Sequence, residues 1–193
     1  MRSQWLVSFL AVLLVIGGLA AGVYHFQQKT ADKRMDRQVN LVESLEREQK
    51  YQEAVEQIDA LLPRVKNPQT RMKLEQLAVR AHLRHGDMGA ARQRAEKYLE
   101  TYPDAPQLGT IYYCLGKIAL EDGGIQKAAK YFETVVQQYP DDPFANAAGL
   151  GLASVEYQID PIGAKKRLDA LVVKNLDPTV REGVESLLGE LNM

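Results

Sequence analysis

The sequence is short of the residue types on which several protein classes depend. Its 193 residues include one cysteine, three histidines and one tryptophan, and its formal net charge is −1. A single cysteine cannot form an internal disulfide, so no disulfide framework holds this fold. A net charge near zero gives no overall attraction to nucleic acid or to acidic membranes.

Motifs for catalysis and metal binding are also lacking. The sequence has no glycine-rich phosphate loop, no Gly-x-Ser-x-Gly elbow, no His-Glu-x-x-His pair and no paired carboxylates. His82 and His85, with Asp87 close by, resemble metal ligands, but no further ligand follows at a suitable spacing. Cys114 lies on an apolar helix stripe without a base at helical spacing, which is typical of a core residue. We expect a protein that is not an enzyme and that uses no cofactor, metal or small-molecule substrate.

The charges are distributed unevenly along the chain. Residues 64–97 carry nine Lys and Arg against three Asp and Glu, whereas residues 121–193 carry seven against twelve. Two interpretations fit this pattern. The charges could lie on solvated helix faces that differ by chance, or the molecule could be dipolar, with a basic middle that attracts an acidic partner. RNA binding through helical repeats needs a continuous basic face, and the acidic C-terminal half argues against it.

The sequence contains one long uncharged apolar run, WLVSFLAVLLVIGGLAAGVY, from Trp5 to Tyr24. As a helix it would span about 30 Å, with an aromatic residue at each membrane interface. A cleaved signal peptide is the alternative, with Arg2 before an apolar Leu6–Ile16 and small residues at Gly17–Gly22. No cysteine stands directly after the run, so we expect no lipid-anchored lipoprotein. We favour an uncleaved anchor, and we assign residues 1–28 to the anchor or signal segment and 29–193 to the domain.

The orientation of this anchor is not decided by its flanking charges. Arg2 lies on one side, and the other side carries Lys29, Lys33, Arg34 and Arg37. The positive-inside rule would place the domain in the cytoplasm. A very short N-terminus instead behaves as a signal anchor, which leaves the domain outside.

The remainder of the chain has helical periodicity and no convincing alternating strand. Proline and glycine breaks divide residues 33–191 into about nine helices of 12–18 residues. One small residue recurs where helices should face each other, at Ala54, Ala91, Ala128 and Ala164, with spacings of 37, 37 and 36. Such a period predicts an all-α solenoid of four helical hairpins. The units cover about 36–66, 68–103, 106–140 and 143–176, and 178–191 forms a capping helix with one apolar and one acidic face.

The third unit resembles the tetratricopeptide repeat, or TPR. Leu115-Gly116, Ala128, Phe132 and Pro140 stand at the Leu-Gly, Ala, Phe and Pro positions of that family. Ala119 departs from it, because the family usually has an aromatic residue there. The second unit keeps the alanine and the proline but lacks the Leu-Gly pair, the outer units are weaker, and the resemblance covers about residues 36–176.

The linkers between hairpins point to one subfamily of the TPR proteins. They are Tyr102-Pro103-Asp104-Ala105-Pro106 and Tyr139-Pro140-Asp141-Asp142-Pro143. The first proline of each ends a helix, the second is suited to the first turn of the next helix, and Asp142 can cap that helix. This YPxxP linker is similar to a long-repeat subfamily of bacterial envelope proteins. They include the outer-membrane-assembly lipoprotein, the Tol-associated cell-division coordinator and the translocon-associated periplasmic chaperone. The resemblance implies a single-pass protein of the bacterial inner membrane with a periplasmic repeat domain.

The resemblance also implies a concave groove lined by the first helix of each hairpin. Groove positions of the family fall on the residues Gln76, Arg80, Arg84, Tyr113, Lys117 and Leu120. A groove of this composition suits an extended peptide with acidic side chains or a free carboxylate. We therefore predict a non-catalytic scaffold that assists assembly of an envelope complex. The alternative is a periplasmic holdase chaperone at the translocon, which should expose more apolar groove residues.

Overall fold

The computed structural model describes residues 23, 25, 26, 29, 30, 33–157 and 159–191, and every regular element among them is helical. This confirms the all-α prediction. None of the helices in these ranges combines the length and the apolar character needed to cross a membrane. The predicted anchor from Trp5 to Tyr24 lies outside the described residues, apart from Val23.

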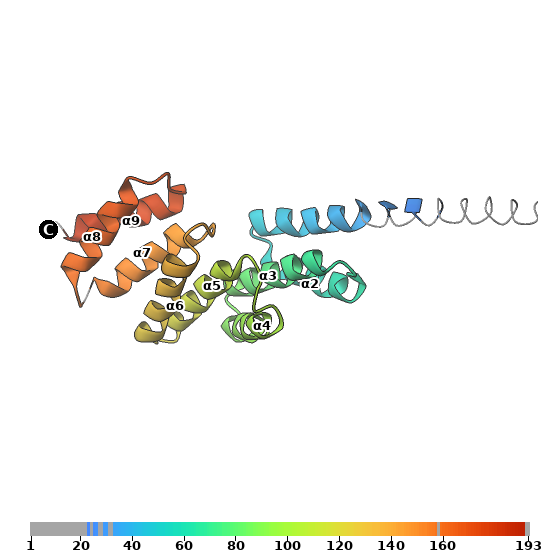
Figure 1. The fold of residues 1–193 in the computed structure, drawn as a ribbon, viewed down its shortest axis with the longest axis horizontal. Coiled ribbons are helices and arrows are strands. Elements are labelled where there is room, and N and C mark those ends of the chain that lie inside the picture. Colours follow the sequence, from blue (N-terminus) through green and yellow to red (C-terminus); the bar gives the residue numbers. More distant parts are fainter. Residues whose placement is uncertain (1–22, 24, 27–28, 31–32, 158, 192–193) are drawn as a thin grey trace, which may run out of the picture. The chain divides into compact units, whose positions relative to one another are not determined.

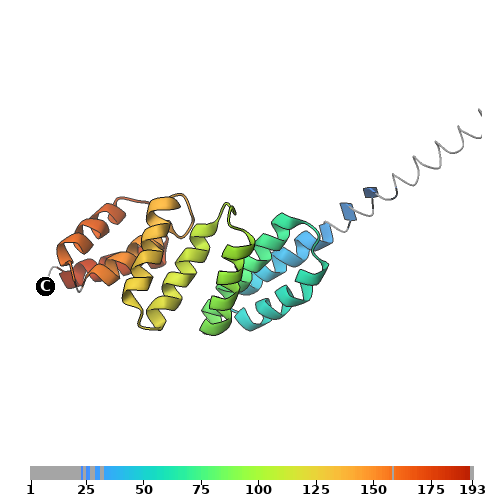
Figure 2. The same ribbon diagram turned by 60° about the horizontal axis from the view of Figure 1, so that its bottom comes forward.

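The chain divides into two compact units, residues 1–44 and 45–193. In the first, residues 33–44 belong to a helix that continues to residue 47. The second contains the elements α2 (Tyr51–Leu61), η1 (Leu62–Arg64), α3 (Pro68–His85), α4 (Met88–Thr101), α5 (Leu108–Glu121), α6 (Ile125–Gln138), α7 (Ala145–Glu156), α8 (Pro161–Val172) and α9 (Pro178–Leu191), shown in Figures 1 and 2.

The helices of the second unit pair into antiparallel hairpins that stack along the chain. The pairs α3–α4, α5–α6 and α7–α8 each pack together, and each second helix packs on the next first helix (Figure 2). The first helices α3, α5, α7 and α9 also contact one another in turn, whereas α4, α6 and α8 have no comparable mutual contacts in the described ranges. The first helices therefore line the inner face of the solenoid.

The repeated small residues are the positions at which each hairpin closes. Ala54, Ala91, Ala128 and Ala164 are all fully buried. The residues one turn further along are fully buried as well: Ile58, Ala95, Phe132 and Leu168. Because a face that recurs every 36 or 37 residues is removed from water in every hairpin, the register predicted from the sequence is confirmed.

Phe132 of α6 is the largest fully buried side chain. A Cβ on Gly116 of α5 would lie 2.5 Å from Phe132 Cε1, and a Cβ on Gly151 of α7 would lie 2.9 Å from Phe132 Cε2. Real Cβ atoms do not come this close to a neighbour. The two glycines therefore let the phenyl ring fill the space between two successive first helices.

Glycine also ends α3, where Gly86 has a φ of 90° in the left-handed region. Asp87 directly follows and caps α4, because its Oδ1 accepts a hydrogen bond from the Ala90 amide at 3.1 Å. Asn67 caps α3 in the same way, accepting from the Thr70 amide at 3.0 Å, with Pro68 in the first helical position. Asn67 and Pro68 thus mark the start of α3, and Gly86 and Asp87 form the turn between α3 and α4.

The YPxxP linkers depart from the prediction in two respects. Pro106 and Pro143 lie in hydrogen-bonded turns two residues before α5 and α7, and not in the first turns of those helices. Asp142 does not cap α7 as its N-cap residue, which is Phe144. The turn at residues 139–142 points the Asp142 carboxylate toward the start of α5 in the preceding hairpin.

At that position Asp142 connects two hairpins. Its carboxylate accepts hydrogen bonds from the Thr110 amide at 2.9 Å, from the Thr110 hydroxyl at 3.2 Å, and from the Phe144 amide at 2.9 Å. Gln107, the N-cap residue of α5, makes no side-chain capping bond. The Asp142 carboxylate, 32 residues downstream of Thr110, therefore accepts the hydrogen bond from the Thr110 amide at the start of α5 that the Gln107 side chain does not accept.

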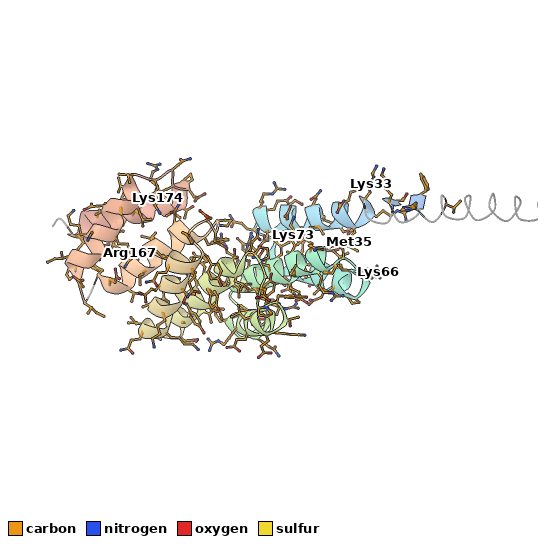
Figure 3. The ribbon with its side chains drawn as sticks, viewed as in Figure 1. Lys33, Met35, Lys66, Lys73, Arg167 and Lys174 are labelled. Atoms are coloured by element: carbon orange, nitrogen blue, oxygen red, sulfur yellow. The ribbon has the colours of Figure 1, made fainter. Side chains whose placement is uncertain are left out.

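The C-terminal helix α9 packs on α7 and α8. Val184 is buried, and the rest of its predicted apolar stripe is partly buried against the same cluster: Val180, Leu187, Leu188 and Leu191. Glu182, Glu185 and Glu190 are exposed. In the preceding hairpin, Arg167 of α8, labelled in Figure 3, lies at the boundary with α7. It donates two hydrogen bonds to Glu156 of α7, at 2.9 and 2.8 Å.

Candidate protein-binding groove

The inner face of the repeat unit centres on Arg80 in α3. Its Nη2 donates to Glu46 Oε2 at 2.7 Å, and its guanidinium carbon lies 5.6 Å from the centre of the Phe144 ring. The Glu46 side chain is 8% exposed and the Arg80 side chain 35%, so the carboxylate is buried while the guanidinium side of the pair still meets water. Arg80 is therefore held from two sides, by a carboxylate and by an aromatic face.

Tyr113 of α5 extends this cluster along the inner face. Its ring stacks on Phe144, with centroids 4.9 Å apart and an interplanar angle of 24°, and its centroid lies 6.0 Å from that of Phe132. Burial raises the pKa of the Tyr113 hydroxyl, and the nearby Arg84 guanidinium partly opposes that rise. Tyr113 thus forms a half-buried aromatic surface with a cation beside it.

Two of the predicted groove cations remain unpaired within the described ranges. Arg84 is exposed at the end of α3, Lys117 is half-buried in α5, and neither makes a hydrogen bond or ion pair through its side chain there. Arg80, in contrast, already has a carboxylate partner. An incoming anion would therefore meet Arg84 and Lys117 first.

The other two predicted groove residues are engaged in packing. Gln76 is buried, and its side-chain amide donates to the Gln107 carbonyl at 3.1 Å, which ties α3 to the start of α5. Leu120 is half-buried against the cluster around Phe132. The Gln76 side-chain nitrogen is thus already engaged, and Leu120 contributes only apolar surface.

Sequence reasoning did not find Glu46 and Phe144. Glu46 precedes Arg80 by 34 residues, and nothing in the repeat pattern marks it as the partner of this arginine. Phe144 follows the second YPxxP linker, where the corresponding residue after the first linker is Gln107. Only a comparison of the two linkers, with attention to the residue after the second proline, could have singled it out.

The predicted core residue Cys114 lies directly behind the groove. It is fully buried, and burial raises the pKa of its thiol to about 12. A thiol with so high a pKa is almost wholly protonated at neutral pH and is a poor nucleophile. This burial agrees with the core role predicted for Cys114.

His82, in the last turn of α3 on the side that faces α2 and α4, is not part of a cluster of metal ligands in the described ranges. Its Nε2 is buried without a hydrogen-bond partner, and its Nδ1 lies 3.5 Å from Asp87 Oδ2. Burial lowers the pKa of His82, Arg94 of α4 lowers it further, and Asp87 and Asp59 of α2 partly oppose the change. The folded protein therefore favours the neutral imidazole.

This shift predicts a pH dependence of stability. A histidine with a lowered folded-state pKa binds its proton more readily in the unfolded chain, so stability falls as the pH drops below about 6.5. We expect the unfolding free energy of His82→Gln to fall less between pH 7.5 and 5 than that of the wild type, measured by urea unfolding. His85→Gln is the matched control on the exposed side of the same helix end, and it should behave as the wild type. Equal pH slopes for wild type and His82→Gln would contradict the prediction.

Comparison with known proteins identifies the family. The sequence matches the profile of the family described as YfiO, outer membrane lipoprotein, over residues 39–159, which is more than half of the chain. The chain belongs to this family. Its description refers to the cell envelope, in agreement with the resemblance to envelope TPR proteins. The only cysteine in the 193 residues, Cys114, is buried in α5 and does not present an acylation site in this fold.

Two solved structures of TPR-like repeat proteins are similar to this chain in fold. Two structures of nearly identical TPR-like repeats, assigned to a kinesin light chain of Podosopora anserina, are similar to this chain. One, a single-substitution variant, is 17% identical with a TM-score of 0.58 and covers 82% of this chain and 93% of its own. The other is 20% identical with a TM-score of 0.59 and covers 82% and 85%. No curated protein matches the sequence.

Proposed function

We propose that the protein is a non-catalytic scaffold of the bacterial cell envelope that holds a partner protein through the inner face of its repeats. The observation that carries this proposal is the arrangement of Arg84 and Lys117, two cations without an ion pair in the described ranges, beside the stacked rings of Tyr113 and Phe144. Cations next to an aromatic surface suit a peptide that places a carboxylate beside an apolar side chain. Membership of an envelope family and the TPR-like fold support the choice of a protein partner.

The Glu46–Arg80 pair adds a second feature to this proposal. Glu46 already places a carboxylate on Arg80 at 2.7 Å, in the position that a ligand carboxylate would otherwise take. A partner therefore binds to the free cations Arg84 and Lys117, and Arg80 keeps Phe144 and Tyr113 in place for it. Gln76 and Leu120 pack in the wall of the groove, where Gln76 ties α3 to the start of α5 and Leu120 packs against the cluster around Phe132.

The cellular arrangement is part of the same proposal. Residues 1–28 tether the protein to the inner membrane, and residues 29–193 face the periplasm, where they assist the assembly of an envelope complex. The uncharged run from Trp5 to Tyr24 and the envelope family support this arrangement. A groove whose exposed groups are cations supports a specific partner over the general capture of unfolded chains.

The test is capture of partner proteins from native membranes by the full-length chain in detergent. The double substitution Arg84→Glu and Lys117→Glu should reduce recovery of the captured partner at least tenfold, because it reverses both free groove charges. The matched control is Lys66→Glu with Lys97→Glu, which makes the same change of charge at exposed positions in the α2–α3 linker (Figure 3) and on α4. Equal recovery by wild type and the groove variant would contradict the proposal, as would equal loss in the control. Stoichiometric suppression of aggregation of a model unfolded protein would instead favour a holdase.

A further inference from the structure

The outward side of α8, near the C-terminal end of the repeat unit (Figure 2), carries the two most exposed large apolar side chains of the described ranges. Ile162, near the start of α8, is 83% exposed, and Val173, at its end, is 85% exposed. Val173 is the C-cap residue, and its right-handed helical backbone continues the helix by one position. The buried residues of α8 lie on the opposite side: Ala164, Leu168 and Leu171. Each end of one helix therefore leaves a large apolar side chain in water.

Two opposite charges stand between these apolar ends. Lys166 and Asp169 are both exposed. Lys166 has no ion pair in the part of the chain that the structure describes, and Asp169 lies 3.7 Å from Lys165. Positions 162, 166, 169 and 173 are spaced by four, three and four residues, so they form one line along the helix. We call these four residues the α8 stripe, and their order is apolar, basic, acidic, apolar.

The order of the α8 stripe is complementary to itself. In an antiparallel pair of two such helices, Ile162 faces Val173 of the second copy, and Lys166 faces Asp169 of the second copy. A twofold axis makes each of these contacts twice. The spacing is that of the apolar seam in a coiled coil, along which two helices can pack. A parallel pair would instead place Lys166 against Lys166 and Asp169 against Asp169, which like charges disfavour.

We propose that α8 docks antiparallel on α8 of a second copy of this chain, with a twofold axis between positions 167 and 168. Charge complementarity selects a second copy as the occupant, because the two charges of the α8 stripe are each other's counterparts and need no further charge. The same contact removes Ile162 and Val173 from water. Val172, 47% exposed beside the stripe, adds apolar area to it.

The size of this contact determines how strong the dimer is. A helix of 12 residues is about 18 Å long. One pair of such helices buries less than the roughly 1,200 Å² at the lower end of stable interfaces. We therefore expect a weak and reversible dimer, which forms when copies are concentrated in one membrane. That concentration rests on the membrane tether of the proposed function, whereas the pairing of the two stripes does not.

The dimer contact is separate from the groove. The groove residues Arg84 and Lys117 lie on the first helices α3 and α5, whereas the α8 stripe lies on a second helix, on its side away from the buried core. Pairing through α8 therefore leaves the groove open in both copies. A dimer presents two grooves, so it binds a partner with two copies of the recognised segment more tightly than one chain does.

The test is thiol crosslinking in cells that express two differently tagged forms of the full-length chain, one with Ile162→Cys and one with Val173→Cys. The two positions face each other in the antiparallel pair, so a short bis-maleimide should join the two forms. Either form alone should give no self-adduct, because two copies of position 162 lie about 16 Å apart along the helix axes. The wild type is the unreactive control, since its one thiol, Cys114, is buried.

Charge substitutions test the pairing itself. Lys166→Asp in both forms places two carboxylates opposite each other and should lower the yield of the adduct at least tenfold. Adding Asp169→Lys to both forms exchanges the two charges and should restore the yield. These side chains are exposed, so circular dichroism should show unchanged helix content. Arg84→Glu with Lys117→Glu, which changes the groove, should leave the adduct unchanged.

The outcomes that would overturn the proposal are distinct. Absence of an adduct between the two forms would do so, as would an equal yield from Ile162→Cys alone. Exchanged charges that do not restore the adduct would contradict the pairing of Lys166 with Asp169. An adduct with a different protein, and none between the two forms, would overturn the proposal in favour of another partner on α8. An intact crosslink together with failed partner capture would contradict the proposed function and leave the dimer standing.

Discussion

Phe132→Ala is expected to lower the unfolding free energy by about 3–5 kcal/mol, the usual cost of removing a buried phenyl ring. The ring is fully buried between α5 and α7, and glycine at positions 116 and 151 leaves no neighbouring Cβ to close the space. The loss should be spread over two hairpins, because the ring contacts the first helix of its own hairpin and that of the next. Urea unfolding followed by circular dichroism measures it on the full-length chain in detergent.

A double-mutant cycle tests whether this packing has the proposed geometry. Gly116→Ala alone should destabilise the protein, because the new methyl group would lie 2.5 Å from the ring. In the Phe132→Ala background the same change should be neutral or stabilising, since alanine favours helix over glycine by about 1 kcal/mol. Gly189→Ala in α9 is the matched control, with no atom within 4 Å of the added Cβ, and it should stabilise in both backgrounds. Additive effects of Gly116→Ala and Phe132→Ala would contradict the account.

Asp142→Ala is expected to cost about 2–3 kcal/mol of unfolding free energy, in the range for hydrogen bonds to a charged group. The substitution leaves the amides of Thr110 and Phe144 without their acceptor at the junction of two hairpins. Amide hydrogen exchange should locate the loss at the starts of α5 and α7. The Phe144 ring also contacts the Tyr113 ring and the Arg80 guanidinium, so partner capture through the groove should weaken in parallel.

The neighbouring residue supplies the control for Asp142. Asp141 is exposed and stands in the same linker, so Asp141→Ala makes the same chemical change without these hydrogen bonds. It should alter the unfolding free energy by less than about 0.5 kcal/mol. Equal effects of the two substitutions would show that the junction does not depend on the Asp142 carboxylate.

The sequence predicted the repeat register well, because the register depends on a periodic pattern. Ala54, Ala91, Ala128 and Ala164 recur at the repeat length, and each is fully buried. A buried face must repeat whenever the same hairpin is stacked again. The local sequence was therefore enough to predict the helices, their order along the chain and the faces that they bury.

The contacts between repeats could not be predicted in the same way. Asp142 looked like a cap for the helix that follows it, yet most of its hydrogen bonds go to Thr110 in the preceding hairpin. Arg80 looked like a free groove cation, yet Glu46 neutralises it across 34 residues. Both pairings depend on how adjacent hairpins are rotated against each other, and this rotation leaves no periodic mark in the sequence.

On the groove, Arg84 and Lys117 stand beside the stacked rings of Tyr113 and Phe144. The acidic residues of α9 close the C-terminal end of the array.

The most direct test of the central claim is site-specific photocrosslinking in native membranes. A photoreactive residue at position 117, on the inner face, should give a discrete adduct with a partner protein, and Arg84→Glu should abolish that adduct. The same residue at position 97, exposed on α4, serves as the control, and protease access in these cells reports the side of the membrane. The account predicts an adduct at position 117 that depends on Arg84. Absence of an adduct at 117, or an adduct that survives Arg84→Glu, would contradict it.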